Sequence, residues 1–366
     1  MKFKFYPRES RIYDFLQFPR LLYSKEEFEK KKEDVNYQNI LIEDYLSFVS
    51  KIEDRLKPFA DEIGKFYVNQ YLSDYDFIDL ISRTTGIMGF QNEKDYLDML
   101  LSLDEYDIRK SIVHSIMLIN DEYPDDLHET MKKANEICLN YEDIISFIKE
   151  LPIEAGAKWN FFLIVEEPLK HMKIYVNLMK KLLPIFNEIY TPYEKKVKDY
   201  GEYLVEFLNN NGAKGLEEIT YSIVNINIFD EKEINIFISI IFSYALSIIT
   251  AKTNYIAWGL RMEEAFKKMK EINENKTLER VQIFKNLGDK TRYEVLKLIA
   301  AGETSTKVIA KTLGVSSATI SYHLNNLLTS KVIKMDKSNN KFGYAVDYEL
   351  LKNTIEGFKK DLNFTK

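Results

Sequence analysis

The chain has 366 residues, which exceeds the usual size of one domain and predicts two or more domains. Hydrophobic residues make up 45% and charged residues 30%, with 13 Gly and 8 Pro, so collagen-like, disordered and low-complexity classes are excluded. Cys138 is the single cysteine, which excludes an intrachain disulfide framework and a metal site built from several thiolates of one chain. The first residues lack the apolar segment of a secretory signal, so we expect a cytoplasmic protein.

Residues 1–270 are predicted to form an acidic, mostly helical body. Residues 2–6 alternate between polar and apolar, as in a short strand. Apolar residues at three- and four-residue spacing then predict helices. These helical runs are Glu26–Leu56, Tyr67–Ile81, Glu93–Asn120, Asp125–Glu150 and Leu163–Leu208. We expect Pro152, Pro168, Pro184 and Pro192 to divide them, because proline lacks the backbone donor that a helix interior needs.

A small β-sheet is predicted near residues 220–258. Tyr221–Phe229 and Ile234–Ile241 alternate at period two around Asp-Glu-Lys-Glu, a hairpin pattern that would place Ile234, Ile236, Ile238 and Ile240 on one face. Ile248–Trp258 could add a third strand. The uncharged run Ile234–Ala251 is also near the minimum length of a membrane-spanning helix. Its Asn, Ser and Thr residues and its alternation favour the sheet, so we expect no membrane association.

The charge is distributed unevenly along the chain. Residues 278–366 hold 15 Lys+Arg and 9 Asp+Glu, a net charge of +6, while the residues before them carry −12. Lys267–Glu279 is polar and reads as a loop or as the solvated end of a helix. We therefore predict two parts, the body at 1–270 and a basic module at 278–366, and the module's charge indicates a polyanionic partner.

The module shows the element order of a winged helix-turn-helix. Asp289 and Ser316 precede helical runs as N-caps, Gly302 ends the first run, and Gly314-Val315 is a tight turn. The predicted helices are Lys290–Ala301, Thr306–Leu313, Ser317–Thr329 and Tyr348–Phe358, with a hairpin of Val332–Asp336 and Phe342–Val346. In this arrangement the helix after the turn projects into the major groove of DNA. The predicted fold is therefore mainly α with small β elements, ending in this domain.

The third helix has an apolar side and a polar side. Ile320, Leu324 and Leu327 cluster on one side and are expected to be core, while Tyr322 and Asn325 lie opposite. Ser, Thr and Asn suit base edges and phosphates, and lysines of the hairpin suit a phosphate backbone. The predicted DNA-contacting residues are Thr306, Ser316, Ser317, Ala318, Thr319, Ser321, Tyr322, His323, Asn325, Asn326, Lys334, Lys337 and Lys341.

The residues from Leu287 to Val346 resemble the winged-helix domain of the ArsR family of bacterial transcription regulators. The matching segments are LGDKTRYEVLKLI at Leu287–Ile299, VIAKTLGVS at Val308–Ser316 and SSATISYHLNNLL at Ser316–Leu328, which contains the family's Ser-x-His-Leu signature. The resemblance implies a homodimeric repressor that recognises an inverted repeat. Two positions depart from the family: Lys331 replaces the usual Gly after the third helix, and Tyr322 replaces a longer polar or basic residue.

The family's metal-sensing sites are not repeated here. Its sensors place cysteines on the second helix, where Thr304–Lys307 has none, or Asp and His on the final helix, where Asp347–Phe358 has no His. We expect no metal and no other cofactor. His323 is more typical of a packed residue that bonds backbone or phosphate than of a metal ligand, since no partner ligand lies nearby in sequence.

The body shows no catalytic motif. His128-Glu129 lacks the second His of the zinc-protease pattern, and there is no phosphate-binding Gly-Lys-Ser/Thr loop or dinucleotide glycine motif. We predict that the protein is not an enzyme. The aromatic residues Trp159, Phe162, Tyr255 and Trp258 could line a pocket for a small-molecule or peptide effector, although aromatic side chains more often form the core.

The sequence therefore predicts a homodimeric, DNA-binding transcription regulator, and a repressor by resemblance. The recognition helix would read the major groove and the wing would follow the backbone, with possible ligand control through the body. One alternative is a protein-interaction or assembly role in which the winged helix is a docking surface. The polar outer face of the third helix argues against it, because protein interfaces favour apolar anchors. A further alternative is an enzyme in the body that the DNA-binding module controls.

Overall fold

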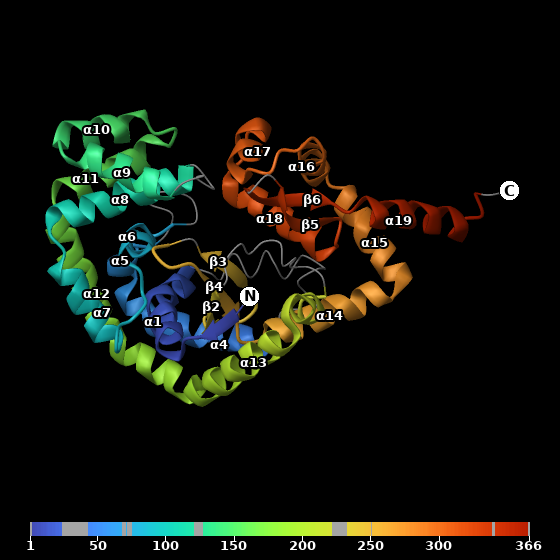
Figure 1. Ribbon diagram of the computed structural model, residues 1–366, viewed down its shortest axis with the longest axis horizontal. Coiled ribbons are helices and arrows are strands. Elements are labelled where there is room, and N and C mark those ends of the chain that lie inside the picture. Colours follow the sequence, from blue (N-terminus) through green and yellow to red (C-terminus); the bar gives the residue numbers. More distant parts are fainter. Residues whose placement is uncertain are drawn as a thin grey trace.

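The computed structural model describes residues 2–23, 43–67, 71, 75–120, 127–221, 233–249, 251–338 and 341–364. It is mainly helical with two small sheets, which confirms the predicted fold class (Figure 1). The elements of the body are β1 (Lys2–Phe5), α1 (Pro7–Gln17), the 3-10 helix η1 (Phe18–Tyr23), α4 (Glu43–Leu56), η2 (Lys57–Phe59), α5 (Ala60–Ile63), α6 (Phe77–Thr85), α7 (Glu93–Ser102), α8 (Glu105–Asn120), α9 (Leu127–Cys138), α10 (Tyr141–Glu150), α11 (Ala155–Glu166), α12 (Pro168–Tyr190), η3 (Thr191–Tyr193), α13 (Glu194–Ile219), β2 (Glu233–Ser239), β3 (Leu246–Ile249), β4 (Tyr255–Gly259) and α14 (Met262–Glu274).

What we call the C-terminal module comprises residues 276–364. Its elements are α15 (Lys276–Leu287), α16 (Lys290–Ala300), α17 (Thr306–Leu313), α18 (Ser317–Thr329), β5 (Ile333–Ser338), β6 (Lys341–Val346) and α19 (Tyr348–Asp361). In Figure 1 the helices of the body form an arc around α1 and the larger sheet, and α14 and α15 lead across to the module. The predicted junction, Lys267–Glu279, is helical apart from a break at Asn275, whose Oδ1 caps α15 by accepting from the amides of Thr277 and Leu278.

The larger sheet joins the chain's first strand to strands far along the sequence. Its order is β1-β2-β4-β3, with β1, β2 and β4 parallel and β3 antiparallel to β4. The predicted strand at residues 2–6 is confirmed, and Phe3 pairs with Ile234. The predicted hairpin partner of β2, residues 221–229, falls almost entirely outside the described residues; the observed hairpin joins β3 and β4 instead.

Strand β2 is buried on both faces, which corrects the expectation of a single apolar face. Ile236 and Ile238 are buried, but so are Phe237 and Ser239 between them. A central strand with parallel neighbours on both sides is typically covered by helices on both faces. The period-two alternation of β2 therefore indicated a strand correctly, although it did not indicate which face would meet solvent.

Helix α1 closes the carboxyl end of β2 through buried polar side chains. Ser10 Oγ accepts from the Ile238 amide at 2.9 Å, and Asp14 Oδ2 accepts from the Ile240 amide at 2.8 Å. The hydroxyl of Ser239 donates to the other oxygen of Asp14. Burial raises the pKa of Asp14 to about 7, against the opposing effect of these hydrogen bonds.

The helical pattern of the body is largely confirmed, with two corrections. Glu93–Asn120 and Leu163–Leu208 each cover more than one helix, and Pro168 begins α12 as expected of a proline at a first helical position. Pro184, however, lies inside α12 and does not end it. The predicted run Glu26–Leu56 is described only from residue 43, and Tyr67–Ile81 is helical only from Phe77.

The apolar core is divided into two clusters. The cluster of the body includes many buried aromatic rings, such as Phe15, Phe18 and Phe186, whose centroids lie 5.2–6.1 Å apart. The cluster of the module is aliphatic among the buried residues described, and Met335 of β5 packs against both clusters. Within the residues that the structure describes, no helix is long and apolar enough to cross a membrane; Ile234–Ala251 contains β2, a turn and β3.

Candidate nucleic-acid interface

The two helices of the predicted turn are set by three short-range features. Ser305 Oγ accepts from the Val308 amide and so caps α17, and Ser316 Oγ accepts from the Thr319 amide at 3.1 Å and caps α18. Gly314 ends α17 with a φ of +67°, a left-handed conformation that favours glycine. These features confirm the helix, tight turn and helix expected from the sequence.

Helix α18 is anchored by its apolar side. Ile320, Leu324 and Leu327 are buried in the aliphatic cluster of the module, as predicted. Their burial turns the opposite side of α18 outward, where Asn325 is exposed and Tyr322 is half-buried. An amide and a phenol on an accessible helix face are groups that can bind base edges or phosphates.

The other predicted contact residues near the turn are also accessible. Those of intermediate exposure are Thr306, Ser317, Thr319 and Ser321, and Ser316 is exposed. The hydroxyls of Ser316, Ser317, Thr319 and Ser321 lie along the start of α18 and extend the polar surface of Tyr322 and Asn325, whereas Thr306 is the first residue of α17. The side chain of Ala318 lies outside the part of the chain that the structure describes.

Two predicted contact residues point inward instead. His323 is 8% exposed and Asn326 is fully buried, with Asn326 Nδ2 donating to the Tyr322 carbonyl at 2.9 Å. Neither side chain reaches the outer face of α18, so direct DNA contact by these two residues is corrected to an interior role. Helical spacing places His323 at the margin of the apolar stripe but Asn326 beside Tyr322 on the outer side, so the sequence pattern was ambiguous only for His323.

The predicted wing is the hairpin of β5 and β6. The strands pair in antiparallel register from Ile333 opposite Val346 to Ser338 opposite Lys341. Lys334 is exposed, and its Nζ lies 4.0 Å from Asp347 Oδ2. The side chains of Lys337 and Lys341 lie outside the described residues, although their backbones form the tip of the hairpin.

Lys331 shows why a glycine is usual after the recognition helix in the resembling family. Its φ is +57°, in the left-handed region. A side chain with a Cβ is disfavoured there, whereas glycine adopts the conformation without steric cost. The chain thus keeps the backbone path and tolerates a strained residue at this turn.

Comparisons with known proteins match the C-terminal module. A family model described as a helix-turn-helix domain matches residues 287–336. The arsenical resistance operon repressor of Staphylococcus aureus is 28% identical over 74 residues, covering 20% of this chain and 71% of that protein. The transcriptional repressor SdpR of Bacillus subtilis (strain 168) is 28% identical over 81 residues, covering 22% and 90%. No solved structure matches.

Residues 287–336 form a helix-turn-helix domain. The resemblance to ArsR-family repressors, expected from Leu287–Val346, is confirmed at low identity over part of the chain. These similarities support a transcription regulator that binds DNA. The family match does not extend into the body.

A second accessible surface of the module was missed from the sequence. Helices α15 and α19 expose apolar side chains, among them Val281 (55% exposed), Ile355 (50%) and Phe358 (37%). The ring of Phe358 packs edge-on against that of Phe284 with centroids 5.0 Å apart. We call this surface the α15–α19 face; it also includes Leu278, Leu362 and Phe364. The three-residue spacing of Leu278, Val281 and Phe284 is the signal that could have revealed it.

The four aromatic residues suggested as an effector pocket are not gathered into one site. Tyr255 and Trp258 are buried and point to opposite faces of β4; Tyr255 stacks on Phe237, whereas Trp258 packs against Phe266. Phe162 packs at the edge of the body's core, and Trp159 is 61% exposed on α11. Tyr255, Trp258 and Phe162 therefore contribute to the core, the role that aromatic residues most often have.

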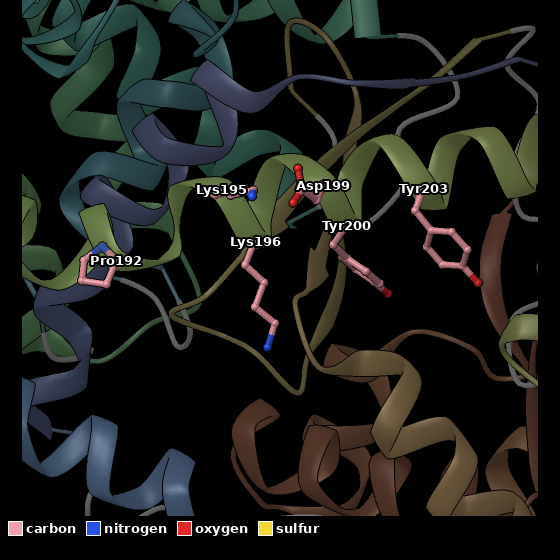
Figure 2. A pocket seen from close by; sticks show the side chains of 6 residues that line it. All are labelled: Pro192, Lys195, Lys196, Asp199, Tyr200 and Tyr203. Atoms are coloured by element: carbon pink, nitrogen blue, oxygen red, sulfur yellow. The ribbon is translucent and has the colours of Figure 1, made fainter.

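The body does carry an open groove along α13. It has a volume of about 490 Å³ and is lined by Pro192, Lys195, Lys196, Asp199, Tyr200 and Tyr203. Figure 2 shows Lys196, Tyr200 and Tyr203 projecting from the same side of the helix. Tyr200 OH donates to Glu263 Oε1 of α14 and accepts from Trp258 Nε1, both at 2.9 Å, whereas Tyr203 is 50% exposed.

Cys138 is buried in α9, and burial raises the pKa of its thiol to about 11. The thiol is therefore protonated at neutral pH and is a poor nucleophile. Cys138 therefore packs as a small residue of the body's core.

Proposed function

We propose that this protein is a sequence-specific transcriptional repressor that binds DNA as a homodimer. Helix α18 would lie in the major groove, and the β5–β6 wing would follow the phosphate backbone. The observation that carries the proposal is the division of α18 into a buried aliphatic side and an accessible side of Ser, Thr, Tyr and Asn residues. The similarity to two repressors supports the direction of regulation.

The charge of the module supports a nucleic-acid partner. Residues 278–366 carry a net charge of +6, although the whole chain carries −6. Basic residues supply the sequence-independent part of DNA affinity by neutralising phosphates and releasing counterions. The acidic body would repel DNA, so the bound duplex is expected to contact the module alone.

The α15–α19 face supports dimerisation. Exposed Phe and Ile side chains on adjacent helices are unusual on a surface that meets only water. Figure 1 shows α19 pointing away from the body and α15 continuing from α14 into the module. A second copy would cover this face isologously and present two copies of α18 to an inverted repeat. If the protein is a dimer, sedimentation of the full chain should give a mass of twice 43.2 kDa. A monomer at all concentrations tested would refute it.

Control by a ligand is supported by the α13 groove. The exposed ring of Tyr203 and the charges of Lys195 and Lys196 suit a small aromatic anion, which can stack and pair with an ammonium. Tyr200 connects the groove through Glu263 to α14, the helix that precedes the module. Thermal-shift measurements with benzoate, salicylate and adenosine monophosphate test this part, with the variant Lys196→Ala as control. If a ligand raised the melting temperature of the variant as much as that of the wild type, the ligand would not bind in the groove.

DNA binding is tested by fluorescence anisotropy of the full chain. Labelled fragments selected from a genomic pool are compared with a random duplex while salt is titrated. A preference of about 10³ or more for a selected fragment, with steep salt dependence, is the expected result. Weak binding that is equal on all sequences would overturn the proposal. Capture of a protein partner by the outer face of α18 would then favour the alternative in which the winged helix is a docking surface.

A further inference from the structure

A polar cluster lies inside the C-terminal module, between the recognition helix and α15. Asn286 comes from α15, Asp289 is the N-cap of α16, Arg292 lies in the first turn of α16, and His323 comes from α18. Three helices therefore meet through side chains beside the aliphatic cluster of the module, where Asn326 and Ser330 of the described residues are also buried.

Close contacts connect these four side chains in a series. Arg292 Nη1 donates to Asn286 Oδ1, and Asn286 Nδ2 donates to the Gln282 carbonyl at 3.1 Å. Asp289 Oδ1 accepts from the Arg292 amide at 2.8 Å and lies 3.7 Å from Arg292 Nε. His323 Nδ1 lies 3.9 Å from the same carboxylate oxygen. This series of contacts thus runs from α15 through α16 to the recognition helix.

Three of the four groups are largely buried, and burial of polar groups is costly. Asn286 is fully buried, His323 is 8% exposed and the Arg292 side chain is 12% exposed, whereas the Asp289 side chain is 35% exposed. Well-packed apolar residues in place of a buried polar network are often neutral or stabilising. A buried polar cluster is therefore better explained by the orientation that it imposes on the helices it joins.

The link between His323 and Asp289 is not closed. Neither His323 Nδ1 nor Arg292 Nε has a hydrogen-bond partner among the described residues. A shift of about 1 Å would bring the 3.9 Å separation of His323 Nδ1 and Asp289 Oδ1 into the normal range for N–H to O bonds. The geometry therefore offers two arrangements of α18 relative to α16, one with this bond and one without it.

His323 and Asn286, the two ends of this series of contacts, belong to helices whose surfaces the proposed function uses. The ring of His323 packs edge-on against that of Tyr322, with centroids 5.4 Å apart, and Tyr322 belongs to the outer face of α18. At the other end, Asn286 lies on the buried side of α15, the helix whose exposed side carries Phe284 of the α15–α19 face. A rotation of α15 on dimerisation would move Asn286, Arg292 and Asp289 together.

We propose that Asn286, Arg292, Asp289 and His323 form a positioning network through which the α15–α19 face sets the orientation of the recognition helix. His323 is a positioning residue in this network and does not contact DNA. The inference rests on the proposed DNA-binding function and adds a thermodynamic coupling to it: dimerisation and sequence-specific binding each strengthen the other by the same factor.

The main test compares His323→Leu with His323→Asn in the full chain. Leu fills the site without polar atoms, whereas the Asn amide places a nitrogen near the position of Nδ1. For the Leu variant we expect affinity for the selected fragment to fall by about tenfold or more, since coupling of this size is typical between linked sites. Affinity for a random duplex should stay within twofold, and the Asn variant should recover most of the loss.

Stability separates positioning from simple loss of folding. Because Leu removes a buried Nδ1 atom that has no hydrogen-bond partner among the described residues, thermal stability of the module is expected to be equal or higher in His323→Leu. A drop in selected-fragment affinity together with unchanged or higher stability supports the network. Equal affinities for the selected fragment in the wild type and the Leu variant overturn it, whatever the stability.

A second variant tests the network from its other end. Asn286→Leu lies on α15 and does not belong to the outer face of α18, and it should weaken selected-fragment binding by a similar factor. The double variant should lose no more than either single one, because members of one network are not additive. Full additivity would overturn the network. If the wild type itself shows no sequence preference, the proposed function fails instead, which separates the two failures.

The pH dependence of the affinity for the selected fragment distinguishes a positioning role from a purely structural one, which would leave it unchanged. Burial lowers the pKa of His323, the Asp289 carboxylate opposes this shift, and Arg292 adds to it; Gln282 and Asn286 are the uncharged groups nearby on α15. Selected-fragment affinity of the wild type should change as pH falls below the ordinary histidine range, because the protonated ring closes on Asp289. That change should vanish in His323→Asn. An identical profile in the two proteins would contradict the network.

Discussion

The body and the C-terminal module place their aromatic residues in opposite ways. The body buries many of its rings, and Tyr175, Phe186 and Trp258 are fully enclosed, although Trp159 and Tyr203 are exposed. The module builds its core from Ile, Leu and Val, and leaves Phe284, Phe358 and Phe364 partly exposed on the α15–α19 face. Large rings in an interior stabilise a fold, whereas rings left at a surface are available to a partner. The contrast assigns partner contacts to the module.

The largest expected effect tests whether the two cores are independent. Phe186→Ala removes a ring packed against Phe15 and Phe18 and should destabilise the body by about 3–5 kcal/mol. Both tryptophans of the chain, Trp159 and Trp258, lie in the body, so tryptophan fluorescence follows its unfolding alone. Leu324→Ala in the module is the matched variant and should leave the fluorescence transition in place. A joint shift of both parts in either variant would show one cooperative unit.

The next effect concerns the α15–α19 face. Phe358→Asp places a charge where a second copy is proposed to pack, and should weaken dimerisation by about tenfold or more, since a buried unpaired charge is costly. Affinity for a two-half-site fragment should fall with it, as measured by sedimentation and anisotropy. Leu139→Asp, at a residue 79% exposed on the body, is the control. An equal effect of the two substitutions would assign the loss to solubility instead of the interface.

The module was predicted closely because its signals are local. Asp289, Ser305 and Ser316 cap helices through bonds within three residues, and Gly314 closes the turn by its own conformation. The sheet of the body was predicted less well, since β1 and β2 pair across more than 200 residues and no local pattern specifies that partner. His323 was misplaced because helical spacing alone leaves the edge of an apolar stripe undecided, and Asn326 because its burial depends on tertiary packing that helical spacing does not specify.

A smaller effect is expected at the proposed base-reading face. Asn325→Ala removes an exposed amide of α18 and should reduce discrimination between the selected fragment and its single-base variants by about 1–3 kcal/mol at one position. Tyr322→Ala should also change the preference. Asn353→Ala, an exposed Asn on α19, is the matched control. Binding profiles across all single-base variants give the measurement, and an unchanged profile for Asn325→Ala would remove α18 as the reading helix.

Asp14 gives the body a pH dependence of stability. Burial raises the pKa of Asp14 to about 7 in the folded body, so the folded state holds a proton that the unfolded chain has lost above its ordinary range. The contribution of Asp14 to stability is therefore greatest at low pH and should fall by about 1 kcal/mol between pH 6 and pH 8, levelling off above the folded-state pKa. Asp14→Asn should flatten this profile in denaturation followed by tryptophan fluorescence. A slope of equal size in the variant would assign the dependence to another group.

The smallest effect separates the wing from the recognition helix. Lys334, Lys337 and Lys341 belong to β5 and β6, and each is proposed to neutralise one phosphate. Replacing any one by Gln should weaken selected and random duplexes alike and reduce the slope of log affinity against log salt by about 1. Lys352→Gln, an exposed lysine on α19, should leave the slope unchanged because α19 faces a second copy instead of DNA. If the three wing variants kept the wild-type slope while Lys352→Gln reduced it, the DNA would lie against α19, and the assignment of the two faces of the module would have to be exchanged.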